Sequence, residues 1–127
     1  MTGTSGITEK KSVVDDQGRL VEEADYVAGI LHGTRALWSP AGVKIAEADY
    51  VTGELHGRSR LWNEAGQLVQ EARYSRGELD GPYSSWWDNG SLKEQGEFKH
   101  GVRVGIYRWF AQDGSLHSEH SYAHKAP

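Results

Sequence analysis

The stretch from Gly42 to Ala65 reads Gly-Val-Lys-Ile-Ala-Glu-Ala-Asp-Tyr-Val-Thr-Gly-Glu-Leu-His-Gly-Arg-Ser-Arg-Leu-Trp-Asn-Glu-Ala, and most of the chain repeats it. Steps of 24 residues connect three aligned columns of residues: Gly18, Gly42, Gly66, Gly90 and Gly114; Tyr26, Tyr50, Tyr74, Phe98 and Tyr122; Trp38, Trp62, Trp86 and Phe110. A fixed period without insertions indicates a repeat array, in which each unit forms one structural motif and stacks on its neighbours.

Each unit contains two runs of strand length, Leu20 to Val27 and Thr34 to Ser39 in the first copy. Glycines at fixed offsets between the runs supply the positive φ angles that hairpin turns need. Connections this short leave no room for crossover helices, so adjacent strands must pair antiparallel. The sequence therefore predicts an all-β fold, an elongated, twisted single-layer antiparallel meander sheet built from about five 24-residue β-hairpin repeats. The runs place about ten strands at roughly residues 9–15, 19–27, 33–39, 43–51, 57–63, 67–75, 81–88, 91–99, 105–111 and 115–122.

The N-terminus differs from the rest of the chain. Residues 1–12 show no periodicity and are expected to form a flexible tail, whereas residues 13–127 are expected to form the repeat domain. Val13 and Val14 occupy the slots that later hold Leu-Trp, so the array is expected to open on half a unit that serves as the first edge strand.

Alternation of side chains along a strand places Leu20, Ala24 and Tyr26 on one face of the sheet. The copies of these residues recur every two strands, roughly 10 Å apart, and build a ladder. The tryptophan column is expected to run beside the tyrosine column, so that the two ladders supply most of the apolar burial.

Composition restricts the function. The chain has 127 residues, 37% of them hydrophobic, a net charge of −4 and no cysteine. Nucleic acid is an unfavourable partner without a basic stripe, and thiol catalysis or a disulfide framework is excluded. No apolar run reaches the roughly 20 residues that span a bilayer, and no secretory signal is evident. We expect a cytoplasmic protein that does not insert into membranes.

The sequence offers no catalytic or metal site. The Glu23, Glu47, Glu71 and Glu119 column has members roughly 10 Å apart, too far for paired catalytic carboxylates or a shared metal. The same argument makes His32 and His56 turn residues rather than ligands. His117, His120 and His124 are closer in sequence, but the first two point to opposite faces of a strand. No hydrolase, zinc-protease or phosphate-loop motif occurs, so we expect no enzyme, no cofactor and no metal.

The unit can be written Tyr-x-x-Gly-x-Leu-His-Gly, followed by Leu-Trp, Gly-x-Leu and a Glu before the next Tyr. This pattern resembles the MORN repeat, specifically the bacterial MORN-repeat-variant group often described as antitoxins, and covers about residues 13–122. The resemblance implies an elongated single-layer sheet used for binding and, for this group, antitoxin or immunity activity. The departures are Lys44 in the Leu20 slot, Arg103 and Val104 in the Leu-His slots, and Gln95 in the Glu column.

Charge gives one candidate binding region. Residues 13–54 hold eight acids against three bases, whereas residues 91–127 hold four acids against five bases. Asp25, Glu47 and Asp49 are therefore candidate contacts for a basic partner such as a nuclease-type toxin. The alternative is that the excess charge only solvates the surface.

Aromatic residues give a second candidate region. On the face opposite the tryptophan column, Tyr83, Trp87, Tyr107 and Trp109 replace the smaller residues of the earlier units. An aromatic patch on a single-layer sheet is covered by the chain's own ends, used in self-association or kept for a partner. With little chain outside the sheet, a protein partner or a homodimer is favoured.

The sequence thus predicts a non-catalytic protein-binding repeat module, with an antitoxin or immunity protein that neutralises a toxin by direct binding as its specific form. The alternative is a structural scaffold or assembly protein that self-associates through its sheet face or edge.

Overall fold

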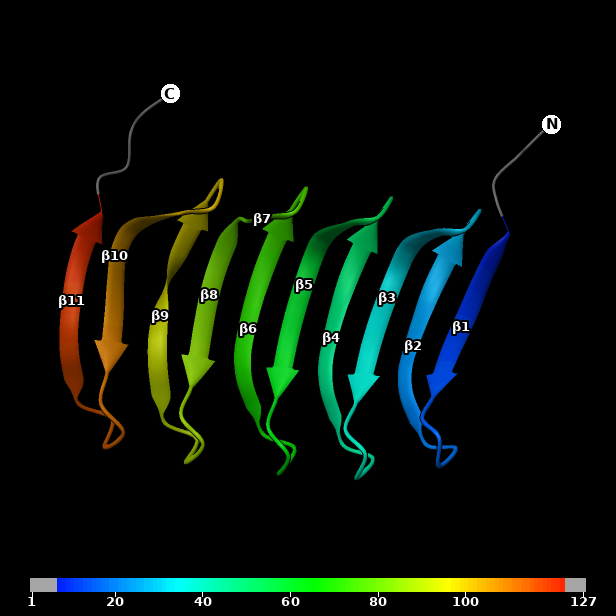
Figure 1. Cartoon of the computed structure of the whole chain (residues 1–127). Coiled ribbons are helices and arrows are strands. Elements are labelled where there is room, and N and C mark those ends of the chain that lie inside the picture. The colour runs from blue at the N-terminus through cyan, green and yellow to red at the C-terminus, as the bar shows by residue number, and fades with distance from the viewer. Residues whose placement is uncertain (1–6, 123–127) are drawn as a thin grey trace.

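A computed structural model describes residues 7–122, which form one open antiparallel β-sheet and contain no helix (Figure 1). Its strands are β1 (Thr8–Val14), β2 (Leu20–Val27), β3 (Ile30–Trp38), β4 (Lys44–Val51), β5 (Glu54–Trp62), β6 (Leu68–Ser75), β7 (Glu78–Leu79), β8 (Gly81–Trp86), β9 (Leu92–Lys99), β10 (Val102–Phe110) and β11 (Leu116–Tyr122). Strands that follow each other in the chain are neighbours in the sheet, except that the short β7 and the following β8 both pair with β6. The predicted all-β meander is confirmed.

The first strand begins close to the start of the predicted run at roughly residues 9–15 and lies partly within the segment expected to be a tail. β1 starts at Thr8 and pairs with β2 from Thr8↔Val27 onward. Residues 8–12, assigned to a tail from the sequence, therefore belong to the sheet, and β1 is its first edge strand.

The hairpin turns are shorter than the sequence suggested. Val27 pairs with Ile30 and leaves only Ala28 and Gly29 in the turn, with φ angles of 52° and 80°. Positive φ at both central residues is the type I′ geometry, which matches the twist of paired strands. Three later turns repeat it: Thr52-Gly53, Arg76-Gly77 and His100-Gly101. The strands that follow these turns consequently start about three residues earlier than predicted.

The glycine of Leu-His-Gly lies in a strand irregularity instead of the turn. Tyr26 pairs with Leu31 and Ala24 with Arg35, so the single residue Asp25 faces three residues of β3. Gly33 lies there with a φ of 124°, and a Cβ on it would come within 2.8 Å of the Asp25 Cβ. Glycine is required because the backbone passes directly beneath the aspartate side chain.

The Leu-His pair of the first two units, and Leu79-Asp80 in the third, holds the turn of the next hairpin. The Gly53 amide donates to the Leu31 carbonyl at 2.8 Å, and the Thr52 amide donates to His32 Nδ1 at 3.1 Å. The next unit repeats both bonds with Gly77 to Leu55 and Arg76 to His56. His32 and His56 are thus structural acceptors. The last unit carries Val104 in this slot, and no further hairpin follows it within residues 7–122.

The two aromatic ladders lie on opposite faces, which corrects the expectation that they run side by side. A two-residue turn pairs even-numbered with odd-numbered residues, so Tyr26 shares a face with Leu31, Arg35 and Leu37, and Trp38 points the other way. We call these the tyrosine face and the tryptophan face.

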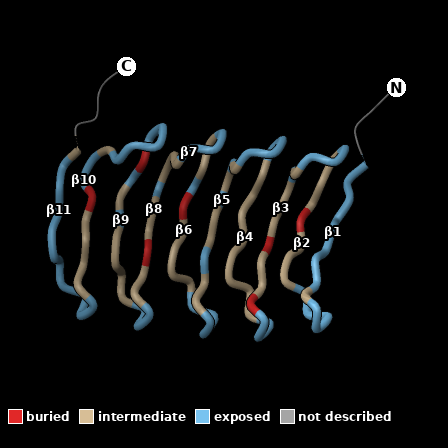
Figure 2. The backbone as a smooth tube through the Cα atoms, in the orientation of Figure 1, coloured by how far each residue is buried: buried red, intermediate tan, exposed pale blue. Residues whose placement is uncertain are grey.

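Burial is sparse because one layer of strands cannot enclose its side chains. Figure 2 shows only short buried segments along a tube that is otherwise half-buried or exposed. The buried hydrophobic residues among those described are Ala24, Ala36, Ala72, Phe98 and Tyr107. The two large ones both lie toward the C-terminal end of the tyrosine face.

Candidate functional site

Aromatic rings gather on the tyrosine face across β8 to β11. The Phe98 ring lies edge-on to Tyr83 and to Tyr107, with centroids 5.6 and 5.9 Å apart. Tyr107 also contacts Trp109 at 4.8 Å and Tyr122 at 6.4 Å. Such edge-on and tilted pairs are favourable beyond the area that they bury. We call the five ring residues together with Arg103 the aromatic–arginine cluster; its rings are Tyr83, Phe98, Tyr107, Trp109 and Tyr122.

Tyr107 occupies the centre of the cluster because Gly96 makes room for it. The earlier units carry Ala24, Ala48 and Ala72 in this column, and a Cβ on Gly96 would clash with the Tyr107 ring. The Tyr107 hydroxyl donates to Glu94 Oε1 at 2.9 Å, and its burial, together with this bond, raises the pKa of Tyr107. The ring is thus fixed at both ends.

Arg103 covers the cluster from the exposed side. Its guanidinium carbon lies 5.5 Å from the Phe98 ring centroid, 4.6 Å from that of Tyr107 and 5.8 Å from that of Trp109. These distances fit cation–π contacts, which strengthen as water is removed. Arg103 is itself exposed, so the cluster presents a cation lying on aromatic surface.

The four aromatic residues predicted as contacts have different positions. Tyr83 and Trp109 are half-buried members of the cluster. Tyr107 has a relative exposure of 0%, so it supports the surface and cannot itself touch a partner, which corrects its assignment as a contact residue. Trp87 lies in the turn after β8, where its indole Nε1 donates to the Phe110 carbonyl at 3.1 Å and Lys93 Nζ lies 4.7 Å from its ring.

The predicted acidic contacts lie on the tryptophan face, away from the cluster. Asp25 accepts from Lys10 Nζ at 2.8 Å and from the Thr34 amide at 3.1 Å, and these bonds lower the pKa of Asp25. Glu47 pairs with Lys44 Nζ at 2.9 Å.

The third acid, Asp49, accepts from the Arg58 amide at 3.1 Å. All three acids therefore have partners within the sheet. Counted from β1 onward, residues 8–54 hold nine acids against five bases, a weaker excess than the count from residue 13 suggested. The structure does not bring the acidic and the aromatic candidates together.

Sequence reasoning missed Phe98, Arg103 and Tyr122 as members of the site. The sequence places Phe98 and Tyr122 in the structural tyrosine ladder and shows Arg103 only as a departure from the repeat. A signal was present, because the alanine column changes to glycine at position 96, on the strand between those of Tyr83 and Tyr107. A side chain lost between two strands that carry tyrosines indicates a specific contact.

Neither face offers metal chemistry within the described residues. No group of three or more His, Cys, Asp or Glu side chains in residues 7–122 could hold a metal ion. His117 and His120 lie on opposite faces of β11, and His124 lies outside the described residues. The same range contains no helix that could cross a membrane.

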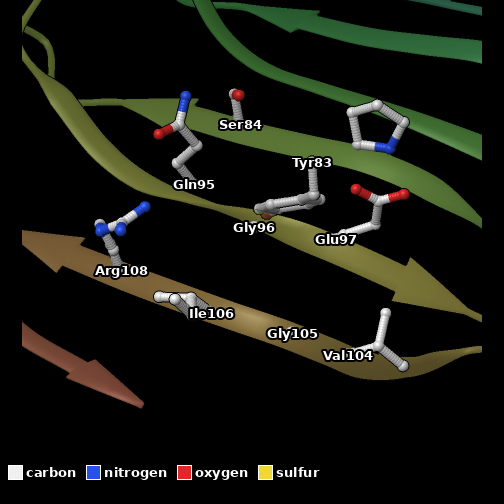
Figure 3. A pocket seen from close by; sticks show the side chains of 10 residues that line it. Tyr83, Ser84, Gln95, Gly96, Glu97, Val104, Gly105, Ile106 and Arg108 are labelled. Carbon is white, nitrogen blue, oxygen red and sulfur yellow. The ribbon is translucent and has the colours of Figure 1, made fainter. Parts of the chain in front are cut away.

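A shallow hollow lies over β8 to β10 beside Gly105, which carries no side chain, on the face opposite Tyr107 (Figure 3). Its volume is about 450 Å³, and polar groups of Ser84, Glu97 and Arg108 line it. These groups can bind or orient polar atoms. Among them, no serine–histidine pair or carboxylate pair forms a catalytic arrangement.

Comparison with protein families gives one match. The family described as MORN repeat variant matches residues 55–75, 79–100 and 103–124, which together are just over half of the chain. No curated protein matches the chain. The matched segments contain the whole aromatic–arginine cluster.

Proposed function

The chain belongs to the MORN repeat variant family, and on that premise we propose that it is a non-catalytic module that binds a protein partner on the aromatic–arginine cluster. Repeats of this family generally bind proteins or membranes and generally lack catalytic activity. Fold alone does not assign a function, so the proposal depends on what this particular surface can do.

The observation that carries the proposal is Arg103 stacked on three rings at an exposed face. Arginine, tryptophan and tyrosine dominate the binding energy of protein interfaces, especially where they are already ordered. Trp109 and Tyr83 are held by neighbouring rings and by the hydrogen bond from Tyr83 to Gln70 Oε1 at 3.0 Å. Binding would therefore cost little side-chain entropy.

The specific form of the proposal is an antitoxin or immunity protein that acts in the cytoplasm and neutralises a toxin by covering it. This form is supported by the resemblance of the repeat to the antitoxin-like group. Its test is co-expression with the product of an adjacent toxin-like reading frame. Rescue of growth together with co-purification is expected, and growth inhibition that persists despite a stable complex would refute neutralisation.

The binding surface is tested with two variants and a matched control. Once a partner has been isolated with the full chain, Trp109→Ala and Arg103→Ala should each weaken binding by about 30-fold, as for interface hot spots. Leu61→Ala is the control, because Leu61 occupies the Trp109 slot two units earlier and is 36% exposed. An equal loss of binding affinity in all three variants would show that the partner does not bind on the aromatic–arginine cluster.

A scaffold that self-associates is the alternative, and the exposed edge strands favour it. Within residues 7–122, β1 and β11 each pair with a single neighbour. Lys10 and Lys11 on β1 oppose edge pairing, since charged side chains protect natural sheet edges. Light scattering over a concentration series separates the two functions, because a scaffold grows in mass with concentration and a monomeric binding module does not.

A further inference from the structure

Two arginines face each other on the tryptophan face at the centre of the sheet. Arg58 of β5 and Arg73 of β6 are directly paired, which places their Cβ atoms about 5 Å apart. Both side chains are exposed, and neither forms an ion pair with another residue in the range 7–122. Like charges directly opposite each other destabilise a sheet, so the pair does not serve folding.

The same pairing position differs in the neighbouring units. Thr34 pairs with Asp49 between β3 and β4, and Pro82 pairs with Glu97 between β8 and β9. Both flanking positions thus combine an acid with an uncharged residue. The two positive charges occur at one place in the array, where the repeat pattern does not require them.

A hollow of about 290 Å³ adjoins this pair. It is lined by the small side chains of Pro82 and Ser84, by three arginines and by one acid: Arg58, Arg60, Arg73 and Glu71. Arg60 is held by Glu71, with Nε 2.9 Å from Oε2. One guanidinium is therefore neutralised and two are not.

Arg73 has a partial structural explanation. Its side chain packs 3.4 Å from the point where Gly81 would carry a Cβ. An aspartate here would also lack the amide that serves Asp25, because the residue facing it on β8 is Pro82, which has no N–H. These facts explain a long side chain at position 73, but any long aliphatic stem would satisfy them. The paired charge of Arg58 and Arg73 is left unexplained.

We infer that Arg58 and Arg73, with the hollow over Pro82 and Ser84, form a second binding site that takes an acidic peptide segment of a protein partner. Two unneutralised guanidinium groups can each bind a carboxylate through paired hydrogen bonds. The hollow provides space for a backbone that follows β8. This site lies on the face opposite the aromatic–arginine cluster and extends the function beyond that surface.

The test uses the full chain and a fluorescein-labelled peptide with four consecutive glutamates. Fluorescence anisotropy should show saturable binding that weakens several-fold between 50 and 200 mM salt, as expected when screening acts on exposed charges. Arg58→Gln and Arg73→Gln should each weaken binding about tenfold, the effect of one charged hydrogen-bonding group. Lys99→Gln is the matched control, because it removes the same charge from an exposed strand end and should change binding less than about twofold.

Two further measurements identify the ligand and check that the variants are folded. The arginine variants should unfold at the temperature of the parent or above it, since removing one of two facing like charges relieves their repulsion. Vesicles of phosphatidylcholine with phosphatidylserine should not compete with the peptide.

Absence of peptide binding, or equal binding by Arg58→Gln, Arg73→Gln and the parent, would overturn the proposal. Arginine-dependent binding to the vesicles without binding to the peptide would also overturn it and assign the arginines to a lipid surface. Because the Trp109→Ala variant should bind the glutamate peptide normally, failure of this site and failure of the aromatic surface are distinguishable.

Discussion

The second hairpin, β4 and β5, and the last complete hairpin, β9 and β10, have the same backbone and different surfaces. Each has a two-residue turn with positive φ at both residues, and each has an irregular register near the glycine that follows Leu-His or its replacement. On the tyrosine face the second hairpin carries Ala48 and Ser59, whereas the last carries Gly96 and Tyr107. That difference separates a flat strip of sheet from an aromatic cluster.

The comparison shows which residues specify the fold and which specify the surface. Turn glycines and the Leu carbonyl acceptors recur because each later hairpin uses them to attach to the previous one, whereas the side-chain acceptor is His32, His56 or Asp80. The column of Arg35, Ser59, Tyr83 and Tyr107 varies because the backbone accepts any of them once the facing residue is small enough. Function can therefore change without disturbing the repeat.

The largest difference between the two hairpins is expected when Tyr107 is truncated. Tyr107→Ala should lower the free energy of unfolding by about 4 kcal/mol, because it empties the centre of a buried cluster. Ser59→Ala at the equivalent position should change it by less than about 0.5 kcal/mol. Urea unfolding measures both, and similar midpoints for the two variants would show that the two hairpins do not differ in this way.

A smaller effect is expected when the facing residue is changed. Gly96→Ala should cost about 3 kcal/mol, since the new methyl group overlaps the Tyr107 ring. Adding Tyr107→Ser recreates the Ala48 and Ser59 combination of the second hairpin. The double variant should lose at least about 2 kcal/mol less than the sum of the single variants. If the losses of the two single variants simply add in the double variant, residues 96 and 107 are not in direct contact.

The connection between hairpins should contribute less than the cluster. His56→Ala removes the acceptor of the Arg76 amide, a bond of 3.1 Å, and should cost about 1 kcal/mol. Hydrogen exchange of the Arg76 amide should accelerate, while the Thr52 amide, which uses His32, should remain protected. Unchanged exchange at Arg76 would rule out the proposed role of the histidine.

The smallest effect is expected at the N-terminal end, where charge replaces aromatic packing. Because the bond from Lys10 lowers the pKa of Asp25, its contribution to stability is present above the unfolded pKa of about 3.9 and is lost as pH falls through the folded value. Asp25→Asn should therefore lose less stability than the parent between pH 7 and pH 3 in urea titrations. Asp16→Asn in the exposed turn should behave as the parent does.

The period and the glycine columns were sufficient to predict the meander, the hairpins and the strand order. The relation between the two ladders was predicted wrongly because the turn was placed too late. A turn of two residues, such as Thr52-Gly53, places Tyr50 and Trp62 on opposite faces, whereas the longer loop assumed from the sequence left their relation undetermined. The available signal was the residue pair ending in glycine, such as Thr52-Gly53, that precedes the second strand of each hairpin.

The candidate surface was only partly predictable. Tyr83 and Trp109 were located by comparing units, but the burial of Tyr107 depends on a contact with Gly96 that crosses strands. The pairing of Asp25 with Lys10 could not be predicted because residues before Val13 do not follow the repeat, so the columns do not give the register of β1 against β2. The repeat alignment shows which positions vary between units, and the register of the paired strands shows which of these residues are in contact.

The hydrogen bonds that hold each turn run in one direction along the chain. Every turn amide that donates to a Leu carbonyl or a His ring finds its acceptor in the hairpin made before it. During synthesis on the ribosome, the template for each new hairpin is therefore already outside the tunnel when that hairpin emerges, and folding can keep pace with translation. Shortening the gene from its 3′ end leaves the remaining turns supported, whereas shortening it from the 5′ end removes the acceptors of the first turn that remains.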